Sequence, residues 1–145
     1  MTIYTIGFTQ KSAAQFFEII RECGAKRLVD IRLHNRSQLA GFTKRNDLEY
    51  FLNSILGVDY VELGLLAPED WFLKEYRRTR DWEIFSERYL TLLGERHIPD
   101  LIPTHVFEDD VILLCSEPKA ERCHRRLAAE FLAGRVLPGA RIQHL

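Results

Sequence analysis

Four consecutive aliphatic residues, Val111 to Leu114, stop abruptly at a polar segment, residues 115–126, after which apolar residues recur with helical spacing. A continuous apolar run of this length is typical of a strand buried on both faces of a parallel sheet. Parallel strands need crossover connections, and these are usually helices. This one run therefore favours a chain in which strands and helices alternate.

The rest of the sequence has that alternation. Apolar runs predict strands at residues 2–6, 27–31, 58–63, 111–114 and 141–145, and helical periodicity predicts helices near 13–23, 48–56, 68–96 and 120–131. Ser12 and Gly24 are a plausible cap and stop for the first helix. We expect an α/β protein: one domain, residues 1–145, with a mostly parallel sheet flanked by helices on both faces, a Rossmann-like three-layer arrangement.

Composition narrows the function classes. The chain has 145 residues, 46% of them hydrophobic, and a formal net charge of -1, which argues against a globally basic nucleic-acid binder. It shows no secretory leader and no apolar stretch long enough to span a membrane. Three cysteines without a leader indicate a reduced, cytoplasmic protein. The oligomeric state is left open.

The segment after the apolar run concentrates reactive side chains: Cys115, Glu117, Cys123, His124 and Arg125. The helix expected to begin at residue 120 points Cys123 and His124 inward from its first turn, toward the strand ends. A helix N-terminus adds positive potential and free N–H groups, which suit an anion and can acidify a thiol.

This segment admits several interpretations. Cys115 resembles the nucleophile of a phosphatase loop, but the arginine falls one residue late, at Arg122. Cys115, Cys123 and His124 could ligate a metal with a fourth ligand such as Asp30, although their spacing is not a usual one for zinc. A third interpretation is a site for an anionic or polar ligand. The structural alternative is that both thiols are buried small hydrophobes and the imidazole is a hydrogen-bonded core residue.

Polar side chains also follow the first two strands. Asp30 and Arg32 lie two residues apart, hence on the same side of their strand. Such a pair is either a structural ion pair or part of a site. Ligands of open parallel sheets bind at the carboxyl ends of the strands, so we expect these groups to meet the segment 115–126 there. The other residues assigned to the ligand are Gly7, Thr9, Arg36 and Ser37.

The helical region 68–96 mixes aromatic and basic side chains, a combination that can bind single-stranded nucleic acid. Acidic residues are interleaved with them, which favours an amphipathic helix pair with a solvated charged face.

Four stretches together resemble the bacterial and archaeal family named domain of unknown function 488: residues 4–20, 28–42, 58–68 and 113–132. The pattern Cys-x-Glu-x5-Cys-His-Arg from Cys115 and the Asp-x-Arg from Asp30 carry the resemblance. It implies a single α/β domain of parallel type and no particular activity. The family's first loop often carries histidine where this chain has Phe8, and its second loop tends to carry proline where this chain has Asn35.

The leading hypothesis is a small hydrolase acting on an anionic ligand, such as a nucleotide or a nucleic-acid fragment, at the carboxyl edge of the sheet. Neither a dinucleotide fingerprint nor a P-loop is present, and no cofactor is expected. Glu117 or Asp30 would be base or nucleophile, and His124 would donate a proton. Ligand-binding residues would be Arg32, Arg36, Arg125, Gly7, Thr9, Ser37 and Cys115. The alternatives are a non-enzymatic protein- or nucleic-acid-binding module whose polar cluster is structural, and a metal-binding protein.

Overall fold

A computed structural model describes residues 1–36 and 40–145 and confirms the predicted fold class. Its five strands form one sheet in the order β3-β2-β4-β1-β5, and every neighbouring pair is parallel. The strands are β1 (Thr2–Gly7), β2 (Arg27–Asp30), β3 (Asp59–Glu62), β4 (Val111–Cys115) and β5 (Arg141–His144).

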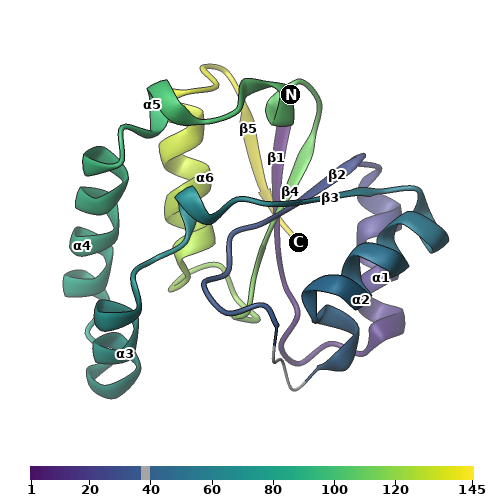
Figure 1. Cartoon of the computed structure of the whole chain (residues 1–145), viewed down its shortest axis with the longest axis horizontal. Helices are drawn as coiled ribbons and strands as arrows, with labels where there is room; N and C mark the ends of the chain where they lie inside the picture. The colour runs from purple at the N-terminus through teal and green to yellow at the C-terminus, as the bar shows by residue number, and fades with distance from the viewer. Residues whose placement is uncertain (37–39) are drawn as a thin grey trace.

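Helices cover both faces of the sheet (Figure 1). On one face lie α1 (Ala13–Cys23) and α2 (Arg45–Phe51), the latter continuing as a π-helical turn, Leu52–Leu56. On the other face lie α3 (Asp70–Thr79), α4 (Trp82–Glu95), α5 (Ile98–Leu101) and α6 (His124–Arg135). Each face has its own apolar core. Short 3-10 turns occupy Gly41–Thr43, Gly64–Leu66 and Thr104–Phe107.

The central strand β4 is buried at all five positions, as the apolar run predicts. Its side chains alternate between the two cores: Leu113 contacts the α3–α6 side, and Leu114 contacts the α1–α2 side. Burial on both faces removes the need for a polar alternation. The polar residues that follow β4 therefore begin where the sheet's carboxyl edge opens.

Local signals explain where α1 begins and ends. The Ser12 side chain accepts a hydrogen bond from the Gln15 backbone N–H, and the Gln15 side chain bonds back to Ser12, which completes a capping box. Gly24 ends the helix in a left-handed conformation (φ +76°), which glycine adopts without strain. The predicted cap and stop are both confirmed.

The helix expected at residues 120–131 is shifted. Residues 120–123 form a turn closed by the hydrogen bond from Cys123 N–H to Ala120 O (3.2 Å), and α6 begins only at His124. Cys123 has extended backbone angles and is the N-cap, so the prediction that it lies within the first turn is wrong. Apolar spacing alone misplaced this boundary, because Ala120 is buried without being helical.

The topology opens a crevice at the carboxyl edge. β1 and β4 are neighbours, but the chain leaves β1 toward α1 on one face and leaves β4 toward α6 on the other (Figure 1). Where connections diverge in this way, open α/β sheets bind their ligands. Among the described residues, no helix combines the length and apolar character needed to cross a membrane.

Candidate functional site

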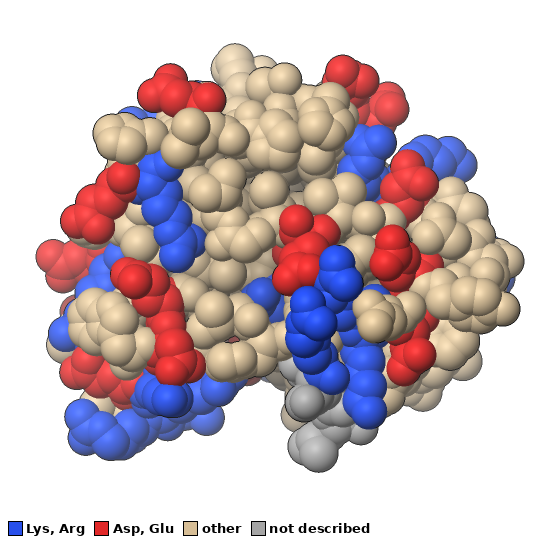
Figure 2. Space-filling model, viewed as in Figure 1, with Lys and Arg blue, Asp and Glu red and all other residues tan. Residues whose placement is uncertain are grey.

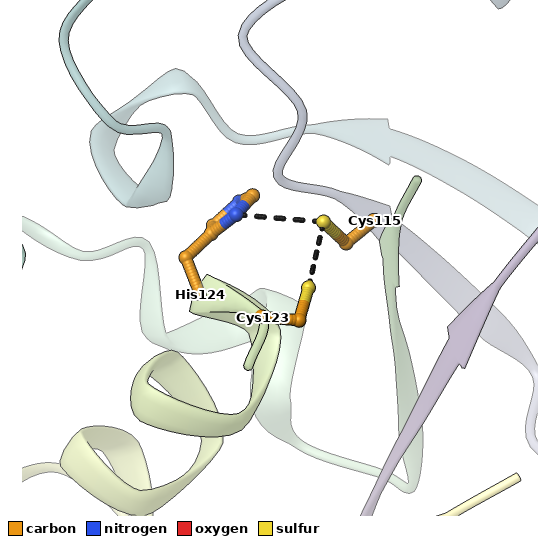
Figure 3. A group of neighbouring side chains, drawn as sticks. All are labelled: Cys115, Cys123 and His124. Atoms are coloured by element: carbon orange, nitrogen blue, oxygen red, sulfur yellow. Dashed lines mark hydrogen bonds between the residues drawn. The ribbon is translucent and has the colours of Figure 1, made fainter. Parts of the chain in front are cut away.

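Three reactive side chains meet at the divergence point. Cys115 is the last residue of β4, Cys123 caps α6 and His124 is its first residue. The Cys123 thiol donates a hydrogen bond to Cys115 Sγ (2.9 Å), and Cys115 Sγ lies 3.4 Å from His124 Nδ1 (Figure 3). All three residues are buried. The sequence placed them near one another; the structure brings their reactive atoms into direct contact.

His124 has a second partner that fixes its role. Its Nε2 lies 2.9 Å from the carbonyl oxygen of Ile31, just beyond β2. A carbonyl oxygen can only accept, so Nε2 carries a proton. Nδ1 then faces the Cys115 sulfur either as a lone pair or, once it takes up a proton, as the donor of an imidazolium ion.

Electrostatics favour the ionised pair. Burial raises the pKa of Cys115, but the hydrogen bond from Cys123, the charge and hydrogen bond of His124 and the backbone N–H of Glu117 together lower that pKa well below 9.0. Burial lowers the pKa of His124, and the Cys115 thiolate and the Ile31 carbonyl outweigh it and raise that pKa above 6.5. Burial and the neighbouring Cys115 raise the pKa of Cys123 well above 9.0. The shifts of the two pKa values favour a proton on His124 over one on Cys115, and they favour the neutral form of Cys123.

Asp30 and Arg32 form a buried ion pair. Asp30 Oδ1 accepts from Arg32 Nε (2.9 Å) and Asp30 Oδ2 from Arg32 Nη2 (2.8 Å), while Asn35 and Tyr60 also donate to Oδ2. Nη2 donates in addition to the Thr43 carbonyl (2.8 Å). Asp30 is fully buried and Arg32 is 4% exposed. Both carboxylate oxygens are thus committed to holding the guanidinium in place.

One nitrogen of that guanidinium is left over. Arg32 Nη1 is buried and has no hydrogen-bond partner in the described part of the chain. A buried donor without an acceptor costs about 1–3 kcal/mol, so such groups usually have a task or an absent partner. The guanidinium also lies over the Phe8 ring, 5.5 Å from its centroid.

A pocket joins these elements. Arg32, Cys115 and His124 line it together with Glu117. An aromatic wall, which consists of Tyr76, Trp82 and Phe85 from α3 and α4, lines another side. Two further arginines, Arg77 and Arg122, add positive charge to the lining. On the face shown in Figure 2, acidic and basic side chains are interspersed, and a group of basic residues stands at its lower left edge.

Residues 12–132 match the family model described as Domain of unknown function DUF488. The chain belongs to this family. The match contains both Asp30–Arg32 and the segment from Cys115 to Arg125, whereas Gly7 at the end of β1 and Thr9 in the loop after it precede the match. No curated protein and no solved structure matches the chain.

Within this DUF488 domain, the Arg125 side chain is hydrogen-bonded to the protein outside the pocket. Its side chain is 1% exposed; Nη1 donates to the Glu117 carbonyl oxygen and Nε to Thr5 Oγ1 (3.3 Å). It does not line the pocket around Cys115. Arg125 thereby holds the β4–α6 loop against β1.

Gly7 makes the same contact possible. A Cβ atom at this position would lie 1.6 Å from the Glu117 carbonyl oxygen and 2.5 Å from Arg125 Nη1. Thr9 supports the loop from the other side, because its backbone N–H and its hydroxyl both donate to the Ser116 carbonyl. Gly7 and Thr9 are therefore placed to shape the loop.

The remaining predicted residues are Glu117, Arg36 and Ser37. The Glu117 residue is exposed at the pocket's lining. Arg36 is exposed and does not line the pocket. Ser37 falls outside the described residues. The structure thus brings Arg32, Cys115, His124 and Glu117 to one pocket, and it places Asp30 and Arg125 behind it.

The same three side chains could supply three ligands to a metal ion. The donor atoms of Cys115, Cys123 and His124 lie within 4.8 Å of one another. Structural zinc sites are tetrahedral and need a fourth ligand. Asp30, the fourth ligand considered from the sequence, has both oxygens engaged by Arg32 and its neighbours.

Sequence reasoning missed three contributors. Tyr60 lies on β3, and the pairing of β3 with β2 brings it near Asp30. The order of strands in the sheet cannot be predicted from local sequence patterns, so this contact could not be foreseen. The sequence favours an amphipathic helix pair with a solvated charged face for residues 68–96, and it gives no sign that Tyr76, Trp82 and Phe85, which pack against the core, also line the pocket. The Ile31 carbonyl, the partner of His124, is a backbone group, so no residue type in the sequence points to it.

Proposed function

We propose that the pocket is an enzyme active site in which Arg32 binds the anionic part of a substrate and Cys115 attacks it as a thiolate. The observation that carries this proposal is the buried, unpartnered Arg32 Nη1, in the described part of the chain, at a pocket that Cys115 also lines. A fixed donor of this kind is suited to a carboxylate, phosphate or sulfate oxygen.

The geometry favours Cys115 over the carboxylates as the reacting group. Asp30 is fully buried and holds Arg32, so both of its oxygens are already engaged. Glu117 is exposed, and its backbone carbonyl, rather than its carboxylate, carries the contact with Arg125. Cys115 combines a lowered pKa with an imidazolium partner, the pattern of an activated cysteine nucleophile.

Hydrolysis is the simplest reaction class for such a site, as it is for the sequence alone. The Cys115 sulfur bonds to the electrophilic atom of the substrate, the bond to the leaving group breaks, and the leaving group takes the Nδ1 proton of His124. Water then displaces the sulfur. Its hydroxyl stays with the product and its proton returns to His124, which restores the thiolate and the imidazolium.

The aromatic wall supports a substrate with an apolar or planar body. Tyr76, Trp82 and Phe85 lie on the same pocket as Arg32, so a ligand can hold its anionic end at the guanidinium and its body against the rings. A nucleotide or another aromatic anion combines an anionic end with a planar body in this way.

Alkylation with two matched reagents tests the proposal. Iodoacetate and iodoacetamide differ in charge but react by the same displacement at a thiolate. In metal-free buffer we expect a higher iodoacetate-to-iodoacetamide rate ratio at Cys115 than at Cys23, the internal control thiol on α1. Inorganic phosphate should slow both reactions at Cys115 and neither at Cys23. Peptide mass spectrometry resolves the two sites.

The variant Arg32→Lys keeps the charge but loses the forked geometry, and it should lower the ratio at Cys115 provided its circular dichroism matches that of the wild type. Equal ratios at the two cysteines, or no protection by phosphate, would remove Arg32 as an anion site. If Cys115 is alkylated only after unfolding, it is not the nucleophile. That result would favour the second function considered from the sequence, a binding module with a structural polar cluster.

A further inference from the structure

We propose that Cys115 and Cys123 form a two-thiol centre that reduces hydroperoxides, with Cys115 as the attacking thiol and Cys123 as the thiol that resolves the product into a disulfide. This inference goes beyond the proposed function, because it depends on the two sulfur atoms and not on Arg32.

The sulfur geometry is the first support. The two Sγ atoms are 2.9 Å apart, and a disulfide bond is about 2.0 Å long, so closure needs a movement of less than about 1 Å. Cys123 is the N-cap of α6 with extended backbone angles, and its side chain makes no capping hydrogen bond. Oxidation would therefore not remove a bond that starts the helix.

The two thiols also differ in the way this chemistry requires. The attacking sulfur must be a thiolate, and the His124 imidazolium and the Cys123 hydrogen bond stabilise Cys115 in that form. Cys123 stays protonated because of its burial and the adjacent negative charge of Cys115. A hydroperoxide entering the pocket meets one nucleophile.

Oxidation of Cys115, the first step, reverses the difference in nucleophilicity between the two thiols. Oxidation to the sulfenic acid removes the negative charge from Cys115, and with it one cause of the raised pKa of Cys123. The Arg125 Nη1 atom, 4.0 Å from Cys123 Sγ, keeps its positive charge and favours the Cys123 thiolate. Cys123 thus becomes the better nucleophile at the moment when it has a sulfenic acid to attack.

The atoms and electrons balance as follows. The Cys115 thiolate attacks the terminal oxygen of ROOH, which carries its hydrogen to the sulfur, and the O–O bond breaks to give Cys115–SOH. The departing RO⁻ takes the Nδ1 proton of His124 and leaves as ROH. The Cys123 thiol then displaces hydroxide from that sulfur; the hydroxide takes the thiol proton and leaves as water. Two equivalents of a small thiol reduce the Cys115–Cys123 disulfide and become a disulfide themselves.

Hydrogen peroxide in chelator-treated buffer is the probe. Oxidised wild-type protein should lose the mass of two hydrogen atoms, and the number of thiols titrated after denaturation should fall from three to one. Peptide mapping should identify a Cys115–Cys123 crosslink, and dithiothreitol should restore the starting mass. With dithiothreitol present, the protein should consume peroxide catalytically.

Three variants sharpen the test. Cys123→Ser should accumulate a sulfenic acid that dimedone traps, and then a sulfinic acid. Cys115→Ser should leave Cys123 unoxidised at doses that convert the wild type. Cys23→Ser is the matched control, because Cys23 lies on α1 and bonds to the Ile20 carbonyl; its loss should leave peroxide consumption unchanged.

The proposal is overturned if the wild type keeps three thiols, if the crosslink involves Cys23, or if Cys115→Ser consumes peroxide as fast as the wild type. Should Cys123→Ser fail to fold, the crosslink map of the wild type decides alone. A protein that forms the disulfide but shows no preference for iodoacetate supports this inference and contradicts the anion site, so the two proposals fail separately.

Discussion

Asp30 holds Arg32 through two parallel hydrogen bonds, Oδ1 to Nε and Oδ2 to Nη2, and this grip aligns the guanidinium so that its remaining nitrogen, Nη1, has no protein partner in the described part of the chain. The carboxylate is fully buried and the guanidinium almost so. An ion pair in this environment fixes a direction as well as a charge.

Replacing Asp30 by asparagine should therefore destabilise the protein by about 3–5 kcal/mol, because it leaves a buried guanidinium without its counter-charge. Urea denaturation followed by circular dichroism measures the loss. The control is Asp59→Asn, whose carboxylate pairs with Arg27 at 3.7 Å with most of its side chain exposed, and it should change the free energy of unfolding by less than about 1 kcal/mol. Equal effects of the two variants would contradict the structural role of Asp30.

Gly7→Ala should destabilise the loop after β4. The new methyl group would overlap the Glu117 carbonyl oxygen, which lies 1.6 Å from the Cβ position, and overpacking of this kind costs about 1–3 kcal/mol. The alkylation rate of Cys115 should change as well, since this loop supplies the Glu117 N–H that its sulfur accepts.

Gly94→Ala is the matched control for that substitution. Gly94 lies in α4, where an added Cβ atom would meet nothing within 4 Å beyond the helix's own backbone, and alanine should stabilise the helix by about 0.5–1 kcal/mol. A Gly7→Ala protein as stable as the wild type would show that the loop is not held against β1.

His124→Asn should slow alkylation of Cys115 at neutral pH. Asparagine can donate a hydrogen bond but carries no positive charge, so the pKa of Cys115 should rise, and each unit by which it exceeds the working pH reduces the thiolate fraction about tenfold. The rate of iodoacetamide reaction against pH gives the midpoint directly. In the wild type it should lie well below 9.0. A midpoint that is the same in both proteins would rule out His124 as the activating group.

The last strand should loosen in acid through His144. Its Nδ1 lies 2.7 Å from Thr5 Oγ1, and burial and the charge of Arg125 lower its pKa below 6.5. A lowered pKa means that the unfolded chain binds the proton more readily. The contribution to stability is therefore present above pH 6.5 and is lost as the pH falls through the folded-state pKa. Arg126 and Glu130 on α6 also act on this imidazole, with opposite signs.

Denaturation at about pH 5 and about pH 7.5, on either side of the ordinary histidine pKa, checks this expectation. Relative to His144→Gln, the wild type should lose stability on going to the lower pH. A difference between the two proteins that does not change with pH would remove His144 as the cause.

The fold could be predicted from the sequence because its signals are local. The unbroken run from Val111 to Leu114 indicates a doubly buried strand, and Ser12 and Gly24 mark the ends of α1. The start of α6 could not be predicted, because Ala120 is buried in a turn and apolar spacing does not distinguish a buried turn from a buried helix.

Part of the candidate site followed from the sequence by topology. Residues after parallel strands meet at one edge, and Arg32, Cys115 and His124 do line one pocket. The sequence cannot show which hydrogen-bond donors lack a protein partner, because that depends on distances between residues far apart in the chain. The sequence predicts both Arg32 and Arg125 as ligand-binding residues, but Arg125 is occupied by Glu117 and Thr5 while Arg32 keeps one nitrogen unpartnered among the described residues. Their roles in binding remain predictions.

The contact between His124 and the Ile31 carbonyl has a consequence for how the protein is made. The groups that acidify Cys115 come from distant parts of the chain: the carbonyl that orients the imidazole follows β2, and the imidazole itself begins α6. While the chain is still emerging or unfolded, we expect Cys115 to react as an ordinary thiol. The proposed reactivity requires β2 and α6 to be in place, so an unfinished chain would be spared that chemistry.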